Sequence, residues 1–158
     1  MVPRRTLDST HLASTMLEPV PANRSFGIEV LHAAHASAEV CMLVPREMTN
    51  VVGSLHSSGL IALVDATGLA ALISAATDES QLEGLVPVGS VARIEFLAPA
   101  HGLLVGRCTV EVDDLAAIET VYKRRRNRAT LSTEAEIFDS QETLVCRGKF
   151  TWSVSRAV

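Results

Sequence analysis

Residues 57–76, SSGLIALVDATGLAALISAA, form an almost uninterrupted apolar run with a single acid, Asp65, near its centre. A helix that is apolar on every side has to be buried on every side. The chain must therefore supply enough surface to surround this helix. With 158 residues, of which 47% are hydrophobic, residues 1–158 can form one domain with a substantial core.

The same run is close to the length of a membrane span, which needs about 20 apolar residues. An acid at the centre of a span would cost roughly 2.5–3.5 kcal/mol on insertion scales. The residues that follow also have the pattern of strands that need a core to cover. We therefore expect a buried helix and no membrane partner. Residues 1–19 contain no long apolar stretch and no small-residue cleavage site, which predicts a cytoplasmic protein without a secretory signal.

Much of the remaining chain alternates between polar and apolar residues, as half-buried strands do. Two adjoining strands are predicted within 26–44, where every second residue from Ala36 to Val44 is apolar. Four more are predicted at 88–97, 103–112, 129–138 and 144–154. The order lacks the βαβ repeat that a parallel sheet needs. An α+β fold, with an antiparallel sheet wrapped around the central helix, is the simplest arrangement.

Two shorter helices are predicted on either side of the central one. Residues 6–18 place Leu12 and Met16 on one face, and prolines follow. Residues 114–126 have apolar side chains at helical spacing and run into a basic cluster. We define this basic cluster as Lys123, Arg124, Arg125, Arg126 and Arg128.

Composition argues against several classes of function. A net charge of −4 does not suit a nucleic-acid partner whose binding depends on counterion release. Cys41, Cys108 and Cys146 are widely spaced and form no CxxC pair, so we expect core thiols and no disulfide framework or metal site. The sequence contains no glycine-rich phosphate loop. We expect no metal and no cofactor.

Four short motifs resemble the hotdog-fold acyl-CoA thioesterases, in particular the phenylacetate-pathway (PaaI-like) type. They are FGIEV at 26–30, N-x5-H-S-S-G-x5-D at 50–65, IEFLAPAHGLLVGRCTV at 94–110 and GKFTWSV at 148–154. The resemblance covers most of the chain. It implies a sheet that wraps the helix, and subunits that join edge to edge with acyl-CoA bound at their boundary. A homodimer, or a homotetramer built as a dimer of dimers, would follow.

The resemblance also implies which residues form the site. The family's motif is an asparagine, then His-Gly-Gly, then an acid, and the matching positions here are Asn50, His56, Ser57, Ser58 and Asp65. Both glycines are therefore serines in this chain, and a serine side chain narrows the approach to a thioester carbon. The amide of Ser57 would hold the thioester oxygen, and Asp65 of the neighbouring subunit would act as base or nucleophile.

The resemblance also implies roles for the neighbouring residues. Asn50 would orient the attacking water. His56 would either take part in the chemistry or only cap and position the loop before the helix. Ser58 and Gly59 would contact the substrate where the helix begins.

The residues alone also single out Asp65. A buried, ionised carboxylate without a partner is costly, so this acid should be paired, protonated or placed on a cavity. Partial desolvation raises the pKa of an aspartate toward the range of a general base. Ser58 lies seven residues earlier, on nearly the same helix face. The alternative is a structural ion pair, for which Arg93 on the following strand is a candidate partner.

Three further residues have both a functional and a structural interpretation. Ser90 falls, by the resemblance, near a hydroxyl that some relatives place beside the acid, or it simply begins a strand. Arg124 and Arg125 of the basic cluster could bind the phosphates of coenzyme A, because guanidinium groups match phosphate oxygens. Otherwise the cluster is a solvated surface.

The leading hypothesis is hydrolysis of an acyl-CoA or acyl-carrier-protein thioester, with Asp65 as base or nucleophile. The alternative is a non-catalytic protein of the same fold that binds acyl thioesters or lipids, which the two serines favour. Dehydration of acyl thioesters on this fold uses an Asp and a His together, and the spacing between His56 and Asp65 does not favour it.

Overall fold

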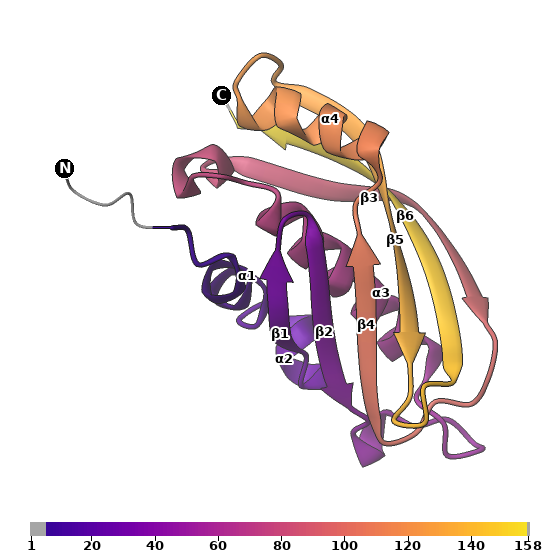
Figure 1. The fold of residues 1–158 in the computed structure, drawn as a ribbon. Helices are drawn as coiled ribbons and strands as arrows, with labels where there is room; N and C mark the ends of the chain where they lie inside the picture. Colours follow the sequence, from indigo (N-terminus) through magenta and orange to yellow (C-terminus); the bar gives the residue numbers. More distant parts are fainter. Residues whose placement is uncertain (1–5, 158) are drawn as a thin grey trace.

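The computed structural model describes residues 6–157 and has six strands that curl around a central helix (Figure 1). The helices are α1 (Ser9–Leu17), α2 (Pro21–Phe26), α3 (Ser57–Ser74) and α4 (Val112–Tyr122), with short 3₁₀ turns η1 (Arg46–Met48) and η2 (Glu79–Leu82). The strands are β1 (Glu29–Ala34), β2 (Ser37–Leu43), β3 (Leu85–Phe96), β4 (Leu103–Thr109), β5 (Arg128–Phe138) and β6 (Leu144–Arg156). Every pairing is antiparallel, in the order β1-β2-β4-β5-β6-β3. The predicted fold class is confirmed.

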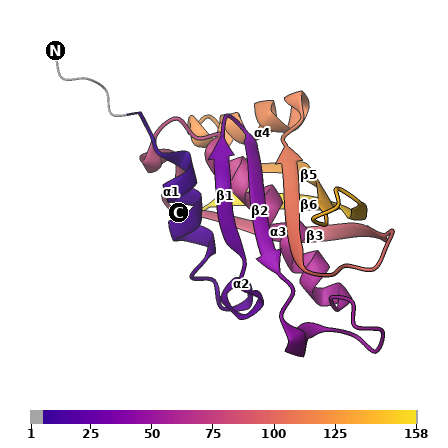
Figure 2. The ribbon, with the colours of Figure 1, turned by 60° about the horizontal axis from the view of Figure 1, so that its bottom comes forward.

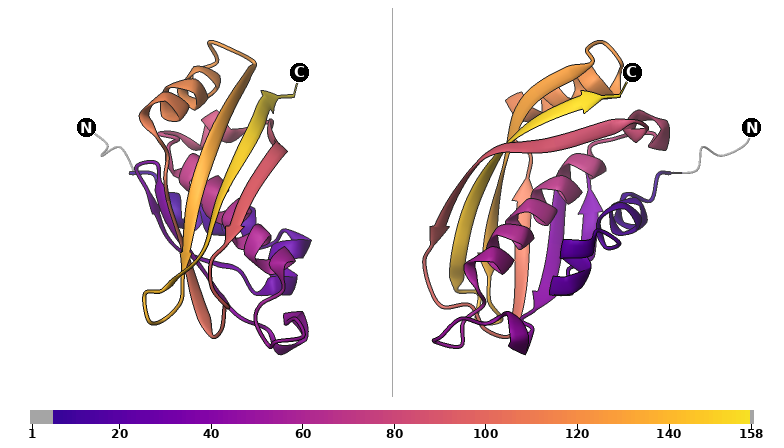
Figure 3. Two further views of the ribbon diagram at one scale, coloured as in Figure 1. Left: turned by 90° about the vertical axis from the view of Figure 1, so that its right-hand side faces the viewer. Right: turned by 180° about the vertical axis from the view of Figure 1, so that it is seen from behind.

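Helix α3 crosses the concave face of the sheet and sits directly on it (Figure 3). Glycines make this close approach possible. A Cβ atom at Gly106 of β4 would clash with the side chain of Thr67, and one at Gly68 would clash with that of Thr133 on β5. The Ala- and Gly-rich composition of α3 is therefore explained by packing against the sheet.

Among residues 6–157, α3 is the one helix whose length and composition would allow it to cross a membrane, with a mean hydropathy of 1.6. However, 67% of this stretch is buried inside the protein. The sheet thus covers the apolar surface that a lipid bilayer would otherwise cover, as expected for the core helix of a globular fold.

The two edges of the sheet differ. Helix α1 runs along β1 (Figures 1 and 2), where the Thr10 hydroxyl donates to the carbonyl of Ala33 (3.2 Å) and accepts from its N–H (3.0 Å). Glu18 accepts from the N–H of Val30 (3.3 Å). These contacts satisfy backbone groups that an edge strand would otherwise leave without a hydrogen-bond partner. Strand β3, at the other edge, is not covered by any element of residues 6–157, and all its residues except Leu85 and Ile94 are exposed.

Several predicted boundaries need correction. Phe26 was expected to begin a strand, but it ends α2, because Pro21 starts a new helix at a position that favours proline and Gly27 closes it in a left-handed conformation. The central helix stops at Ser74 and not at residue 76. The strand predicted at 103–112 ends at Thr109, since acids in the following turn suit the positive end of α4.

Helix α4 overlaps the helix predicted at 114–126, but it begins two residues earlier, at Val112, and ends at Tyr122. Most of the basic cluster therefore lies in the turn after it. The Tyr122 hydroxyl donates to the carbonyl of Leu72, near the end of α3. Asp114 accepts from the N–H of Ser132 on β5 (2.8 Å). These bonds hold α4 and the basic cluster at the end of the molecule where α3 finishes (Figure 1).

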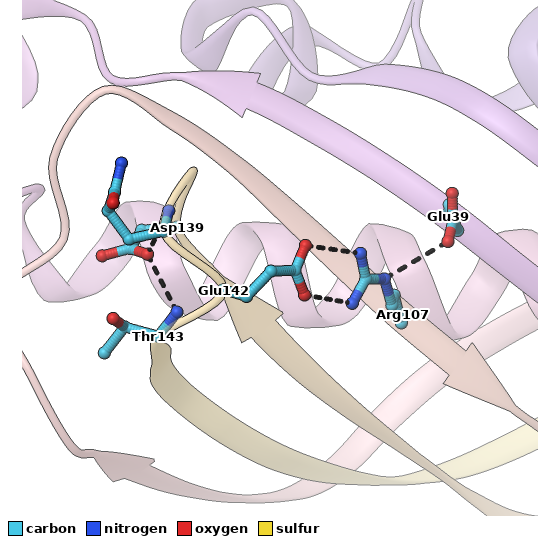
Figure 4. Close-up of polar contacts among 6 residues, drawn as sticks. Glu39, Arg107, Asp139, Glu142 and Thr143 are labelled. Atoms are coloured by element: carbon cyan, nitrogen blue, oxygen red, sulfur yellow. Dashed lines mark hydrogen bonds and ion pairs between the residues drawn. The ribbon is translucent and has the colours of Figure 1, made fainter.

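A row of alternating charges crosses the outer face of the sheet. Its members are in register on neighbouring strands: Glu39, Arg107, Glu136, Arg147 and Glu95. Arg107 also reaches the hairpin turn after β5, where both of its terminal nitrogens donate to Glu142 at 2.9 and 3.1 Å, while its Nε donates to Glu39 at 3.2 Å (Figure 4). The charged side chains of this face therefore find ionic partners on the same face.

The three cysteines, Cys41, Cys108 and Cys146, are buried free thiols, as predicted. Burial raises the pKa of the Cys108 thiol to about 12. Such a thiol is a poor nucleophile, because the thiolate is the reactive form.

Candidate active site

The loop before α3 ends at His56, whose side chain caps the helix. Its Nδ1 accepts the N–H of Ser58 (3.1 Å) and lies 2.7 Å from the Ser58 hydroxyl. The N–H of Ser57 makes no hydrogen bond to any residue of the described part, 6–157. A free N–H at the positive end of a helix favours negative charge. Ser57 is therefore a suitable donor to a developing oxyanion, the role that the resemblance predicts.

Asn50 shapes the loop that leads to this helix. Its side-chain oxygen accepts from the N–H groups of Val52 and Ser54, both at 3.1 Å, and its own N–H donates to the carbonyl of Ser54 (2.8 Å). The oxygen is thus already used within the loop. Any contact between Asn50 and a water or substrate would have to come from its amide nitrogen.

A hollow of about 350 Å³ opens between this loop and the end of β3. It is lined by Asn50, Val52, Ser54, Leu55, Ser57, Leu60 and residues 96–99. The fold therefore brings Asn50 and Ser57 to one cavity, as the motif predicts. Asp65 is not among the lining residues.

Gly59 was predicted to contact substrate, but the structure gives it a packing role. It is buried, and a Cβ atom at this position would lie only 2.7 Å from Cδ1 of Leu55. Leu55 is itself fully enclosed in the core. The glycine lets the loop close tightly over the first turn of α3.

Asp65 lies on the one face of α3 that the sheet leaves partly open. Ser58 is exposed, and Ala62, Asp65 and Leu69 are half-buried, whereas most other residues of the helix are buried. Within residues 6–157, Asp65 makes no hydrogen bond or ion pair, so the alternative pairing with Arg93 is absent. Burial raises the pKa of Asp65 to about 6. The described residues thus leave Asp65 without a partner, and its pKa lies near neutral pH.

Asp65 and the Ser57 amide cannot meet one thioester group within a single chain. They are eight residues apart on a straight helix, which corresponds to about 12 Å along its axis. A reacting carbonyl must lie about 3 Å from its hydrogen-bond donor and within reach of the base, directly or through one water. If these two groups act on one thioester, they must therefore come from different chains.

The remaining predicted residues lie apart from the helix N-terminus. Ser90 sits at a bulge in β3 between Gly89 and Val91, and its hydroxyl donates to the carbonyl of Thr151 (3.1 Å). Arg124, in the turn after α4, donates to the carbonyl of Ser80 (3.4 Å). That turn lies at the end of the molecule opposite the loop before α3 (Figure 3). Neither position is brought to the hollow of the same chain.

Ile61 lies between the two halves of the site and was not singled out by the sequence analysis. It is half-buried and stands midway between Ser57 and Asp65 along α3. Its helical spacing of four residues from each could have pointed to it. No group of three or more His, Cys, Asp or Glu residues that could hold a metal ion occurs in the described region.

Comparison with solved structures places this arrangement in the hotdog-fold class. The E. coli PaaI protein from the phenylacetic acid degradation operon aligns with a TM-score of 0.68 and 22% identity, covering 96% of this chain and 94% of that chain. A Pseudomonas aeruginosa protein described as a probable thioesterase aligns with a TM-score of 0.74 and 19% identity, covering 94% and 96%. A hypothetical thioesterase from Streptococcus pneumoniae aligns at 0.61 and 19%, covering 82% and 91%.

The amino-acid sequence also identifies a family. Residues 9–154 match the model of a family described as a domain of unknown function, DUF4442, and the chain belongs to that family. No curated protein matches the sequence. The solved neighbours, at these identities, show the fold, and the activity has to be argued from the site.

Proposed function

We propose that this protein hydrolyses acyl thioesters, with acyl-CoA as the substrate and Asp65 as the general base. The observation that carries this proposal is the half-buried carboxylate of Asp65 on the open face of α3, which has no partner within residues 6–157. Burial raises the pKa of this carboxyl group to about 6. A base works best when its pKa is close to the working pH. The descriptions of the solved neighbours as probable or hypothetical thioesterases support the same chemistry.

The reaction follows from the two halves of the site. The N–H of Ser57 donates to the thioester oxygen, and Asp65 of the partner subunit takes a proton from a water molecule as it attacks the carbonyl carbon. The tetrahedral intermediate then collapses and its C–S bond breaks, which releases the free acid. Asp65 returns its proton to the departing thiolate, so that coenzyme A leaves as the thiol and the base is regenerated. Helix α3 stabilises the oxyanion through its N-terminal dipole. The acyl chain lies along the apolar part of the open face.

A homodimer joined through β3 would complete the site. This strand is an uncovered sheet edge, and the exposed fractions of Val88 and Val91 are 55% and 61%. Native proteins rarely leave a long apolar edge strand unpaired. Antiparallel pairing of β3 with its copy continues the sheet and places the two α3 helices side by side. The two-fold axis must then pass near Ile61 for Ser57 to face the partner's Asp65.

The same pairing determines where the basic cluster of the partner subunit lies. Antiparallel β3 strands place the start of one strand beside the end of the other. The partner's basic cluster would then lie at the end of the molecule where the hollow next to Ser57 opens. We propose that Arg124 and Arg125 of the partner subunit bind the phosphates of coenzyme A there.

Release of free thiol over a panel of acyl-CoA substrates tests the activity. Asp65→Asn keeps the shape of the side chain but removes the base, so we expect a loss of about 100-fold or more in kcat. Asp113→Asn, which changes an exposed acid at the start of α4, is the control and should leave the rate unchanged. A wild-type rate in Asp65→Asn would contradict the proposed role.

A non-catalytic acyl-binding protein is the second candidate, because serines stand where the resembled family has two glycines. In that case the wild type and Asp65→Asn would release thiol equally slowly, while acyl-CoA would still bind. For either function we propose the cytoplasm as the location, since three buried free thiols suit a reducing compartment.

A further inference from the structure

The contact between His56 and Ser58 determines which ring nitrogen carries the proton. The backbone N–H of Ser58 is always a hydrogen-bond donor, and it points at Nδ1 of His56 from 3.1 Å. While the ring occupies the cap, Nδ1 must therefore be an acceptor, without a proton of its own. A neutral imidazole then carries its proton on Nε2. The Ser58 hydroxyl, 2.7 Å from the same Nδ1, has to donate to it as well.

We propose that Ser58 is a positioning residue that holds His56 as the Nε2–H tautomer, so that the imidazole serves as a second hydrogen-bond donor beside the Ser57 amide. This inference rests on the proposed thioesterase function and extends it to a position where the resembled family has glycine. The hydroxyl supplies the shorter of the two contacts to Nδ1. Its loss should let the ring leave the cap and exchange between tautomers.

The choice of histidine as the capping residue supports a role beyond capping. Serine, threonine, aspartate and asparagine are the preferred N-caps, and any of them could accept the Ser58 N–H. Histidine adds a second nitrogen. Nε2 of His56 makes no hydrogen bond to any of residues 6–157, and the side chain is exposed. It is therefore free to donate to the thioester oxygen or to the departing thiolate.

The same geometry argues against Ser58 as a nucleophile activated by His56. A base must accept the hydroxyl proton on Nδ1. A protonated Nδ1 would then face the Ser58 N–H, donor against donor, and the cap would be lost. The hydroxyl therefore orients the ring, and Asp65 remains the base.

The tautomer can be observed without any substrate. Long-range ¹H–¹⁵N correlation spectra of the untagged protein distinguish the two neutral tautomers of each histidine, and His56→Asn identifies the His56 signals by their loss. We expect a single Nε2–H pattern in the wild type and in Ser58→Thr, which keeps a hydroxyl. Ser58→Ala should give a mixture of tautomers. An Nδ1–H pattern or a mixture in the wild type, or a single Nε2–H pattern in Ser58→Ala, would overturn the proposal.

Kinetics then test the donor role. Ser58→Ala should lower kcat about tenfold with little change in KM, because one hydrogen bond that positions the ring is lost. Ser58→Thr should restore most of the rate, and Ser25→Ala, at an exposed position of α2, is the control. His56→Asn keeps a capping oxygen but lacks the distal donor, so its melting temperature should be unchanged while kcat falls.

The outcomes separate this inference from the proposed function. Full activity in Ser58→Ala or His56→Asn, with an active wild type, would overturn the positioning role and leave the thioesterase intact. Absence of thiol release by the wild type over the whole acyl-CoA panel would remove the proposed function and the donor role with it. Covalent acylation of Ser58, seen by mass spectrometry, would contradict the assignment of its hydroxyl.

Discussion

At the scale of single residues, the sequence pointed to Asp65 because an ionised acid in an otherwise apolar helix is costly to bury without a partner. The structure agrees that the acid is half-buried and has no partner within residues 6–157. The sequence could not show that Asn50 uses its oxygen inside the loop or that Gly59 is required for packing. Those facts depend on how the loop folds back, and no residue spacing encodes them.

The raised pKa of Asp65 makes stability depend on pH. Because folding raises this pKa from 3.8 to about 6, the fold favours the protonated acid, and this contribution is lost as the pH rises through about 6. Ionisation then costs at most about 3 kcal/mol, since one pKa unit corresponds to about 1.4 kcal/mol. We expect Asp65→Asn to melt at a higher temperature than the wild type at pH 8, with the gain shrinking toward pH 4.

Thermal unfolding at pH 4, 6 and 8 measures this effect. Asp113→Asn serves as the reference, because its carboxylate is exposed. A gain of equal size at all three values of pH, or a loss at pH 8, would show that ionised Asp65 is not destabilising.

At the scale of helices and strands, alternation of polar and apolar residues predicted the strands well, and the long apolar run predicted the central helix. Helix α2 was missed because Pro21 was interpreted only as a stop, although proline also begins helices. The hairpin turn between β1 and β2 gave no signal either. His35 and Ala36 adopt left-handed conformations there, which glycine or asparagine usually occupy.

The seating of α3 on the sheet can be tested at Gly106. An alanine there would press its methyl group against Thr67, so we expect Gly106→Ala to lower the free energy of unfolding by roughly 1–3 kcal/mol. Adding Thr67→Ala should relieve part of the clash. Urea denaturation of both single variants and the double variant measures the coupling, and strictly additive losses would contradict this contact.

At the scale of the whole molecule, the proposed function requires a site that two chains share. The resemblance implied a site at a subunit boundary. The length of the helix gives the physical reason for such a site, because about 12 Å along the helix axis separate the proposed oxyanion donor from the proposed base. The asymmetry of the sheet edges, one covered by α1 and one bare, was not predicted from the sequence. It depends on contacts between segments that lie far apart in the chain.

The proposed pairing through the uncovered edge strand β3 can be tested by introducing charged side chains on it. Val88→Asp and Val91→Asp place carboxylates on β3, and we expect them to shift a dimer toward monomer, because like charges meet across a two-fold axis. Val112→Asp is the matched control, since Val112 is 80% exposed and lies away from β3. Sedimentation or size-exclusion chromatography with light scattering reports the mass. An unchanged mass in both β3 variants would rule out this interface.

The basic cluster makes a separate prediction about substrate size. We expect Arg124→Ala and Arg125→Ala to raise KM for acyl-CoA about 3- to 10-fold, while leaving KM for an acyl-N-acetylcysteamine unchanged, because the short substrate has no phosphates. Arg24→Ala, at an exposed position of α2, controls for a general change in charge. Equal effects on both substrates would exclude a phosphate contact.

Complementation between two inactive subunits tests the shared site most directly. Ser57→Pro removes the amide donor at a helix position that tolerates proline, and Asp65→Asn removes the base. We expect both homodimers to be inactive. A heterodimer purified through two different affinity tags should recover about half of the wild-type rate, because one of its two symmetric sites is intact. A heterodimer as inactive as its parents, or an active Ser57→Pro homodimer, would contradict a site built from Ser57 of one chain and Asp65 of the other.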